Sequence, residues 1–462
     1  MRPFSMRDKL GYTLGDLGCC CTEQFRAMYL SVFYTLILQV NPFHIGILML
    51  ITKIWDAVND PIIGAIVDSR KATKGGKFIP WIRAFSFPMA VLCILGFVNV
   101  SNLAYGLRLA YMFVTYVLYE ALYTCVNVPF GTLSSVMTDD VRHRTALSRY
   151  RSLGGTIFMT VIVMVGPLVL YVDNKPVAGR FLMLASVFAL IGLLCLQITC
   201  VWCKERVAVP ERPKGEKLNY LHVIKEIAKN KALLGVMFFS LVGMIGASVV
   251  NGLNTYLFKD YFGNVKIMAV SGGLSVLYSV ITFAMTQPLA DKLGKKEWCC
   301  WGAGFAAAVF ALLFFFPIHN PVLFIVINGV CYLGASGMQV LIWAMVNDSI
   351  DYHELQTGER NEGIVYSTYS FFRKLASAVS GSLSSFVLGF IGYNVAEGAV
   401  QTAEVSNAIW KSYTGIYVLG YGVAVAILFF VYPLTKAKTT EMLEQLKARR
   451  AEKASAVETD GE

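Results

Sequence analysis

The chain has 462 residues, of which 56% are hydrophobic and only 15% are charged. A soluble globular protein carries about 25% charged residues, so this composition excludes an ordinary soluble domain and favours an integral membrane protein. The formal net charge of +10 does not indicate nucleic-acid binding, because the Lys and Arg residues gather in alternate loops between apolar segments. The positive-inside rule assigns such loops to the cytoplasm, which predicts a multi-pass protein of the cytoplasmic membrane with both termini inside.

In chain order, roughly twelve apolar segments are each long enough to cross a bilayer, which takes about 20 mainly apolar residues. We expect them near residues 10–38, 43–68, 79–101, 105–137, 150–172, 179–203, 232–259, 266–290, 298–317, 321–348, 363–392 and 410–434. The sequence therefore predicts an all-α membrane protein with twelve transmembrane helices.

The longest polar stretch inside the chain divides these segments into two groups of six. We predict an N-terminal six-helix bundle over 1–203, a cytoplasmic central loop over 204–231, a C-terminal six-helix bundle over 232–434 and a cytoplasmic tail over 435–462. Residues 218–229 of the central loop place apolar side chains at helical spacing with Lys opposite, which predicts a short amphipathic helix on the membrane surface.

Acidic residues at the ends of certain segments repeat between the two halves. Asp68 follows the second segment and Asp291 the eighth, each at the membrane edge and before a basic turn, while Asp348 and Asp351 close the tenth. Such an echo between six-helix halves is typical of the major facilitator arrangement. We interpret these four residues as a conformational latch, in which carboxylates hold helix ends and Arg side chains in one state.

The second segment carries acidic residues in its middle. Asp56, Asn59 and Asp60 lie at positions i, i+3 and i+4, hence on one helix face. A carboxylate at membrane depth costs about 3 kcal/mol, so a pair of them indicates a cation site. Hard oxygen ligands suit Na+, and an empty site would favour a proton on one carboxylate; both coupling cations stay open. The structural alternative is an Asp paired with Lys53 or Arg373.

Several motifs occur together and in order along nearly the whole chain. They read Gly11-Tyr-Thr-Leu-Gly-Asp16, Trp55-Asp-Ala-Val-Asn-Asp-Pro-Ile-Ile-Gly64, Gly76-Lys-Phe-Ile-Pro-Trp81, Val126-Asn-Val-Pro-Phe-Gly-Thr-Leu133 and Tyr366-Ser-Thr-Tyr-Ser-Phe-Phe-Arg-Lys374. The set resembles the glycoside-pentoside-hexuronide:cation symporters, the family of melibiose permease and the bacterial glucuronide carrier. The resemblance implies a major facilitator fold and import of a sugar or glycoside driven by a cation, with no enzymatic activity.

The resemblance also implies roles for particular residues. Thr124 matches the Thr that completes the family's cation site with the three polar residues of the second segment. Lys374, with Arg373 before it, matches a buried Lys of the eleventh helix that lies near both sugar and cation. Arg151 matches a sugar-contacting Arg of the fifth helix, with Arg149 as the alternative.

The chain departs from melibiose permease at the sugar-binding positions. Cys20 and Asn127 stand where that protein has two Asp residues, and Gly131 stands where it has a Trp. A pocket that loses two acids and keeps its bases suits an anionic sugar, through bidentate Arg–carboxylate pairing. We therefore predict a hexuronide or glucuronide substrate, with Tyr369 among the aromatic side chains able to stack on a sugar ring.

Two alternative substrates stay open. Asp16, Glu23 and Glu120 also lie within helices and would neutralise the bases, which favours a neutral pentoside, xyloside or other glycoside. A sodium-coupled lysolipid carrier would share the fold, but it needs a mainly apolar cavity. We expect the partners to be the sugar, the coupling cation and the lipid bilayer, with no further cofactor, no nucleic acid and a monomeric protein.

Overall fold

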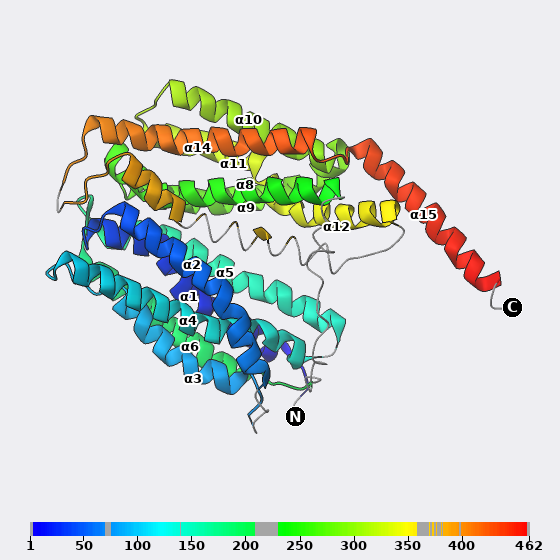
Figure 1. Cartoon of the computed structure of the whole chain (residues 1–462), viewed down its shortest axis with the longest axis horizontal. Helices are drawn as coiled ribbons and strands as arrows, with labels where there is room; N and C mark the ends of the chain where they lie inside the picture. The colour runs from blue at the N-terminus through cyan, green and yellow to red at the C-terminus, as the bar shows by residue number, and fades with distance from the viewer. Residues whose placement is uncertain are drawn as a thin grey trace. The chain divides into compact units, whose positions relative to one another are not determined.

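Helices make up nearly all of the described chain (Figure 1). The computed structural model describes residues 3–69, 75–138, 140–207, 230–357, 369, 372–373, 376, 380, 382–396 and 399–459. The strands within these residues are two short ones, β1 (Tyr171–Val172) and β2 (Lys175–Pro176), which pair antiparallel in a hairpin. The expectation of an all-α protein is confirmed.

The first half of the chain forms six long helices close to their predicted positions. These are α1 (Met6–Leu36), α2 (Pro42–Ser69), α3 (Ile79–Leu95), α4 (Tyr105–Met137), α5 (Val141–Leu170) and α6 (Ala178–Trp202). The first helix begins with a capping box, in which the side chains of Ser5 and Asp8 bond to each other's backbone amides. The helices α1 and α5 begin earlier than the apolar segments expected from residues 10 and 150, because their first turns are polar.

The second half contains two features that were not predicted, a turn at Ser336 and a helix in the tail. Its helices are α8 (Lys231–Tyr256) with a π-helical turn over Leu257–Tyr261, α9 (Ile267–Leu293), α10 (Lys295–Phe315), α11 (Pro321–Ala335), α12 (Gly337–Thr357), α14 (Ala403–Phe430) and α15 (Lys436–Thr459). A single turn residue, Ser336, separates α11 from α12, and the two together form one stretch, Pro321–Gln356, that is long and apolar enough to cross a membrane, as expected over 321–348. The predicted tail contains α15. The amphipathic helix expected over 218–229 and most of the segment expected over 363–392 lie outside the described residues.

Eight of the described helical stretches are long and apolar enough to cross a membrane. The helices α1 and α2 are not among them, although they have 31 and 28 residues. Both carry ionisable side chains in their middle, among them Asp16 and Glu23 in α1 and Asp56 in α2. Ionisable residues within membrane helices mark functional sites by default, so these two helices are the first place to search.

The structure divides into two compact units that do not coincide with the two halves of the sequence. Unit 1 comprises Met1–Pro213, Asn251–Gly273 and Gly381–Asn407, and unit 2 comprises Lys214–Val250, Leu274–Ser380 and Ala408–Glu462. Short segments of the second half therefore pack with the first six helices. The predicted division at residues 203 and 232 stays a prediction.

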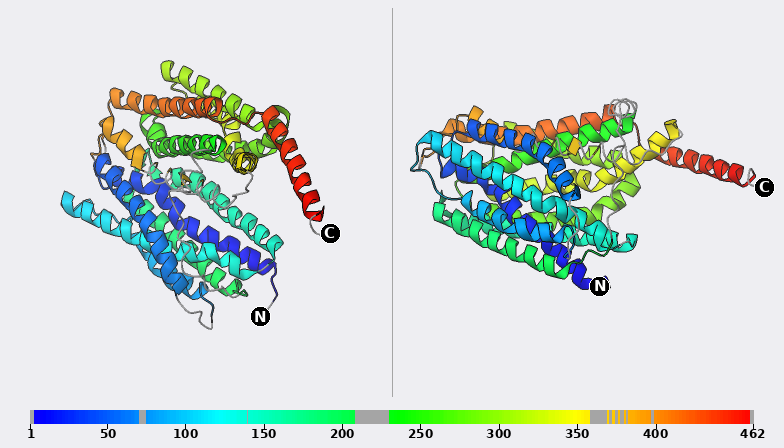
Figure 2. Two further views of the ribbon diagram at one scale, coloured as in Figure 1. Left: turned by 45° about the vertical axis from the view of Figure 1, so that its right-hand side comes forward. Right: turned by 60° about the horizontal axis from the view of Figure 1, so that its bottom comes forward.

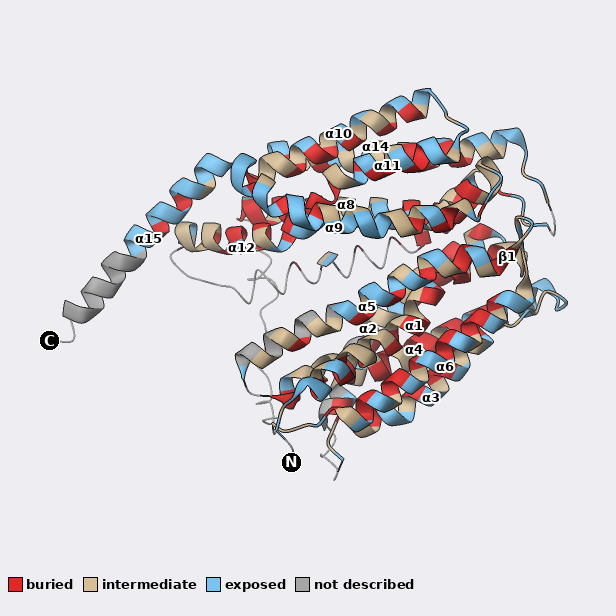
Figure 3. Ribbon diagram, turned by 180° about the vertical axis from the view of Figure 1, so that it is seen from behind, coloured by how far each residue is buried: buried red, intermediate tan, exposed pale blue. Residues whose placement is uncertain are grey.

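Unit 1 is built around α1, which packs against α5 and α6 along much of its length. Buried residues follow α1 and the neighbouring α4 (red in Figure 3). Glycines permit the close helix approaches: a β-carbon on Gly154 of α5 would lie 2.5 Å from the Thr13 carbonyl oxygen of α1. Small residues at helix crossings are the usual device for close packing in lipid.

The β1–β2 hairpin of the first half is hydrogen-bonded to a segment of the second half within unit 1. Asn174, in the turn between β1 and β2, has a φ of 62°, a left-handed conformation that Asn tolerates better than most residues. Its side chain donates to the carbonyl oxygen of Lys259 at 2.8 Å and accepts from the amide of Val265 at 2.9 Å. The hairpin thus satisfies backbone groups where α8 ends.

Unit 2 has its own hydrophobic core, with buried residues from α8, α10, α12 and α14. The C-terminal helix α15 runs on from the end of α14 at an angle (red in Figure 2). Met442 and Leu446 of α15 are buried, and the guanidinium of Arg449 donates to the carbonyl oxygen of Leu355 at the end of α12. The C-terminal segment is therefore part of unit 2 over its first turns.

Candidate functional site

The polar face of α2 is formed by Lys53, Asp56 and Asn59. The Lys53 ammonium donates to Asp56 Oδ2 at 3.0 Å. Asn59 is 5% exposed, and its side-chain nitrogen has no hydrogen-bond partner among the described residues. Asp60 lies in α2, but its side chain is outside the described part of the structure. The Asp56–Lys53 ion pair, which was the alternative to a cation site, is thus observed. The role of Asp56, Asn59 and Asp60 in binding a cation stays a prediction.

The helix α4 adds a second carboxylate to this face. Glu120 Oε2 lies 3.8 Å from the Lys53 nitrogen, and its side chain is 5% exposed against 20% for Asp56. Thr124, one turn further along α4, is buried. Because α2 packs directly on α4, the predicted cation ligands of both helices belong to one region of unit 1. The position of Glu120 within that region could not be predicted from the sequence.

A buried Arg of α1 lies in the same interior, and the ion pairs seen among the described residues do not include it. Arg26 of α1 is 3% exposed, and the described residues offer its guanidinium nitrogens no hydrogen-bond acceptor. The guanidinium carbon instead lies 3.6 Å from the ring centroid of Tyr119 and 5.1 Å from that of Tyr116. A desolvated cation over an aromatic face is stabilised by about 2 kcal/mol. Glu23, one turn before Arg26 on α1, forms no hydrogen bond with these guanidinium nitrogens among the described residues.

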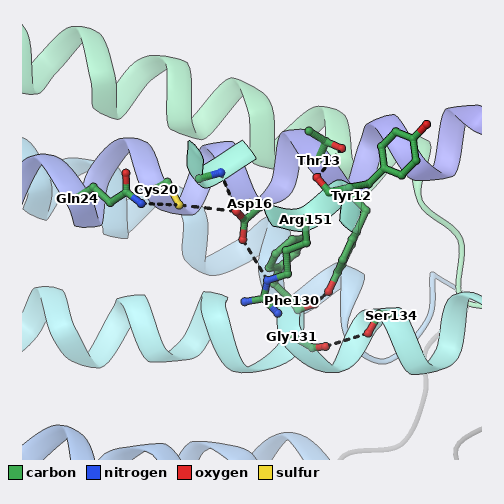
Figure 4. A network of polar contacts seen from close by, with 11 residues as sticks. Tyr12, Thr13, Asp16, Cys20, Gln24, Phe130, Gly131, Ser134 and Arg151 are labelled. Atoms are coloured by element: carbon green, nitrogen blue, oxygen red, sulfur yellow. Dashed lines mark hydrogen bonds and ion pairs between the residues drawn. The ribbon is translucent and has the colours of Figure 1, made fainter. Parts of the chain in front are cut away.

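The second polar cluster joins α1, α4 and α5 (Figure 4). Arg151 Nε donates to Asp16 Oδ1 at 3.1 Å, and the amide of Gly155 donates to Asp16 Oδ2 at 3.0 Å. The Cys20 thiol lies 3.8 Å from Asp16 Oδ2, and the Gln24 amide donates to the Cys20 sulfur at 3.5 Å. The predicted sugar-site residues Cys20 and Arg151 are therefore linked through Asp16.

The same guanidinium reaches α4. Its carbon lies 5.2 Å from the ring centroid of Phe130, and a β-carbon placed on Gly131 would lie 3.6 Å from Arg151 Nη1. Figure 4 shows the head of Arg151 between Asp16 on one side and Phe130 and Gly131 on the other. Asn127, one turn before Gly131 on α4, is partly buried. Three of the predicted substrate positions, Cys20, Gly131 and Arg151, are thus brought together in unit 1.

This arrangement leaves one edge of the guanidinium directed at the position without a side chain. Asp16 engages Arg151 through Nε, whereas Nη1 is the atom nearest Gly131. An Arg whose orientation is fixed by a carboxylate loses less entropy when its remaining donors bind a ligand. The alternative candidate Arg149 lies in α5, with its side chain outside the described part.

The predicted substrate residues of the second half lie in unit 2. Tyr369 is buried, its hydroxyl shares a hydrogen bond of 3.0 Å with Ser240, and its ring meets that of Trp343 edge-on at 5.0 Å. The Arg373 guanidinium carbon lies 5.8 Å from the ring centroid of Trp343. Lys374 lies outside the described residues. The roles proposed for Tyr369, Arg373 and Lys374 stay predictions.

The predicted latch residues have different surroundings. The Lys295 ammonium donates to both carboxylate oxygens of Asp348 at 2.8 Å, which ties α10 to α12. Asp291 accepts from the Gln287 side chain at 2.9 Å and is exposed. Asp351 is partly buried, and the side chain of Asp68 is outside the described part. Lys295 is the partner that the sequence did not identify, although it closes the basic turn after α9.

A protein-family model covers nearly the whole chain. Residues 11–436 match the family described as MFS/sugar transport protein. Among curated proteins, the chain is 31% identical to the uncharacterized symporter YjmB of Bacillus subtilis, with 96% of this chain and 95% of that protein covered. It is 29% identical to the isoprimeverose transporter of Lactiplantibacillus pentosus (97% and 93% covered) and 25% identical to the glucuronide carrier protein homolog of Escherichia coli (96% and 96% covered).

Solved structures of transporters share the fold. The nucleoside transporter NupG superposes with a TM-score of 0.60 at 14% sequence identity, covering 94% of this chain and 99% of that one. A D-xylose-proton symporter gives a TM-score of 0.59, also at 14% identity, covering 93% and 98%. At this level of identity the likeness concerns the fold and carries no information about substrate.

Proposed function

This chain belongs to the MFS/sugar transport protein family and has the all-α major facilitator fold of a membrane transporter, and on that premise we propose that it imports a sugar or glycoside by cation-coupled symport. The cation would be Na+ or H+. The protein would lie in the cytoplasmic membrane with both termini inside, as the basic loops favour. The two halves would alternate access to a central site.

The observation that carries the proposal is the carboxylate of Asp56 in the interior of unit 1. One of its ion-pair partners is Lys53 of its own helix, and two further acids, Asp60 and Glu120, belong to the same helix pair. A buried carboxylate that loses its positive partner is destabilised by several kcal/mol. If the Lys53 ammonium leaves Asp56, we therefore expect another cation to take its place. Asp56, Asn59 and Asp60 with Thr124 are the ligands we propose.

We propose a hexuronide or glucuronide as the substrate class. The support is the guanidinium of Arg151, which Asp16 orients and whose Nη1 lies toward the unfilled position at Gly131. A sugar carboxylate would pair with that edge through charge-assisted hydrogen bonds. The Cys20 and Asn127 positions add no negative charge to oppose such a carboxylate.

A neutral xyloside is the second candidate, and one observation favours it. The Asp16–Arg151 ion pair already neutralises the one described cation of this cluster, which lowers its attraction for an anion. A related protein that is 29% identical is described as an isoprimeverose transporter. The two candidates differ in charge, so uptake of one of each class separates them.

The experiment that tests the proposal measures uptake in cells that express the chain. Labelled methyl β-glucuronide and methyl β-xyloside are each supplied with and without Na+, and with and without a protonophore. We expect accumulation of the glucuronide that depends on one of the two ion gradients. Accumulation of the xyloside alone would contradict the hexuronide assignment, and uptake of either sugar without dependence on an ion gradient would contradict symport.

Substitution of the acids tests the cation site. Asp56→Asn and Asp60→Asn should each lower gradient-driven accumulation by about tenfold or more, because the site loses the charge that holds the cation. The protein should still be present in the membrane. Glu404→Gln, which changes an exposed carboxylate of α14, serves as the control. Undiminished accumulation in both Asp variants would show that the coupling ion binds elsewhere.

A further inference from the structure

Lys53 lies between two carboxylates that belong to different helices. Its ammonium is 3.0 Å from Asp56 Oδ2 on α2 and 3.8 Å from Glu120 Oε2 on α4. The side chains are 25%, 20% and 5% exposed for Lys53, Asp56 and Glu120, respectively. The ammonium is thus within ion-pair distance of both acids while bonded to the more exposed one.

A coupling cation bound at Asp56 would share one carboxylate with the Lys53 ammonium, which is bonded to its Oδ2 atom. Two unit positive charges about 4 Å apart repel by about 4 kcal/mol at an effective dielectric constant of 20. A cation that binds Asp56 must therefore displace the ammonium from that carboxylate. Lys is suited to such a movement, because its charge is compact and its four-carbon stem is flexible.

Glu120 is placed to receive the displaced ammonium. The 3.8 Å separation means that a shift of the ammonium toward α4 exchanges one carboxylate partner for the other without exposing the charge. Arg26, a further cation among the described residues of this interior, stacks on Tyr119 at 3.6 Å. Tyr116 and Glu23 also lie within electrostatic range of Lys53.

We propose that the Lys53 ammonium competes with the coupling cation for Asp56. The ammonium pairs with Asp56 when no cation is bound, and it moves to Glu120 when the cation binds. Glu120 is then a positioning residue that sets the cation affinity without contacting the cation. The inference rests on the proposed cation site at Asp56. It explains why the interior of α2 tolerates an acid in the absence of a bound ion.

The test compares Lys53→Met, Glu120→Gln and the double variant. The readout is the half-saturating concentration of Na+, or of protons if wild type couples to protons, for sugar uptake and for direct cation binding to the purified protein. Lys53→Met should lower this concentration by about tenfold, because the competitor is removed. Glu120→Gln should raise it by a similar factor, because the ammonium loses its second partner, and the double variant should resemble Lys53→Met.

Opposite shifts are the result that a merely structural ion pair would not give. Shifts in the same direction, or no shift in either single variant, would overturn the inference. If Lys53→Met fails to reach the membrane, Glu120→Gln decides alone, and an unchanged cation affinity in it would refute the role of Glu120. Lys175→Met, at an exposed Lys of the β-hairpin, is the control for loss of a positive charge.

The cation dependence of the wild-type protein separates the test of symport from the test of competition by Lys53. A wild-type protein whose uptake does not depend on any cation would refute the symport itself. A wild-type protein that depends on a cation, with single variants that do not shift in opposite directions, would refute only the competition by Lys53.

Discussion

At the scale of single residues, the ion pair between Asp16 and Arg151 determines how the candidate sugar site presents its positive charge. The pair joins α1 to α5 across 135 residues of sequence, and a second contact, from the Gly155 amide, holds the same carboxylate. Charge-assisted hydrogen bonds of this kind are about twice as strong as neutral ones. The guanidinium is therefore oriented before any ligand arrives.

Arg151→Lys tests this orientation. A Lys keeps the positive charge but lacks the planar fork that can bond to Asp16 and to a ligand together. We expect the KM for the transported sugar to rise about tenfold with little change in the amount of protein in the membrane. Arg180→Lys, at an exposed Arg near the start of α6, should leave the KM unchanged. An unaltered KM for Arg151→Lys would move the assignment to Arg149.

At the scale of the helices, close crossings depend on glycines whose missing side chain brings two backbones together. Gly154 of α5 faces α1, where a β-carbon would lie 2.5 Å from the Thr13 carbonyl oxygen and 2.7 Å from the Leu17 amide nitrogen. Backbone atoms cannot move aside as the end of a flexible side chain can. The two helices would have to separate to admit a methyl group.

Gly154→Ala should therefore destabilise the protein by about 1–3 kcal/mol, the usual cost of overpacking. Thermal unfolding of the purified protein in detergent measures the effect. Gly106→Ala is the matched control, because nothing lies within 4 Å of a β-carbon at that position of α4. Equal melting temperatures for the two variants would show that α1 and α5 can separate without cost.

The junction between α11 and α12 is a detail that the hydropathy pattern did not indicate, although the two helices together form the single apolar stretch Pro321–Gln356. The apolar pattern runs on through residues 321–348 and predicts one span. In the structure α11 ends before Ser336, whose hydroxyl shares a 2.8 Å hydrogen bond with that of Thr282 on α9. A hydrogen bond to a residue 54 positions away along the chain has no signature in a local hydropathy pattern, because hydropathy records composition and not partners.

At the scale of the whole molecule, coupling requires that sugar and cation each change the binding of the other. Linkage makes the two effects equal: a saturating sugar should lower the dissociation constant of the cation by the same factor, about 5- to 150-fold, by which a saturating cation lowers that of the sugar. Titration calorimetry of the purified protein measures both. A sugar that cells do not accumulate should leave cation binding unchanged, and independent binding of the two ligands would contradict symport.

The sequence by itself determined the class of protein, the positions of most helices and the identity of the ionisable residues within them. Membrane insertion depends on the local composition of about 20 residues, and Asp56 and Arg151 are conspicuous there because charge at membrane depth is costly. The match of the family model to residues 11–436 confirms the resemblance that the motifs indicated.

The tertiary structure alone decided which of these residues are partners. It placed Lys53 between Asp56 and Glu120, joined Arg151 to Asp16, stacked Arg26 on Tyr119 and packed segments of the second half with the first six helices. Apart from the Lys53–Asp56 pair within α2, each of these pairings depends on the rotation and crossing of helices that lie far apart in the sequence. The same hydropathy pattern is compatible with many pairings of acids and bases, and the packing of the helices decides which pairs form.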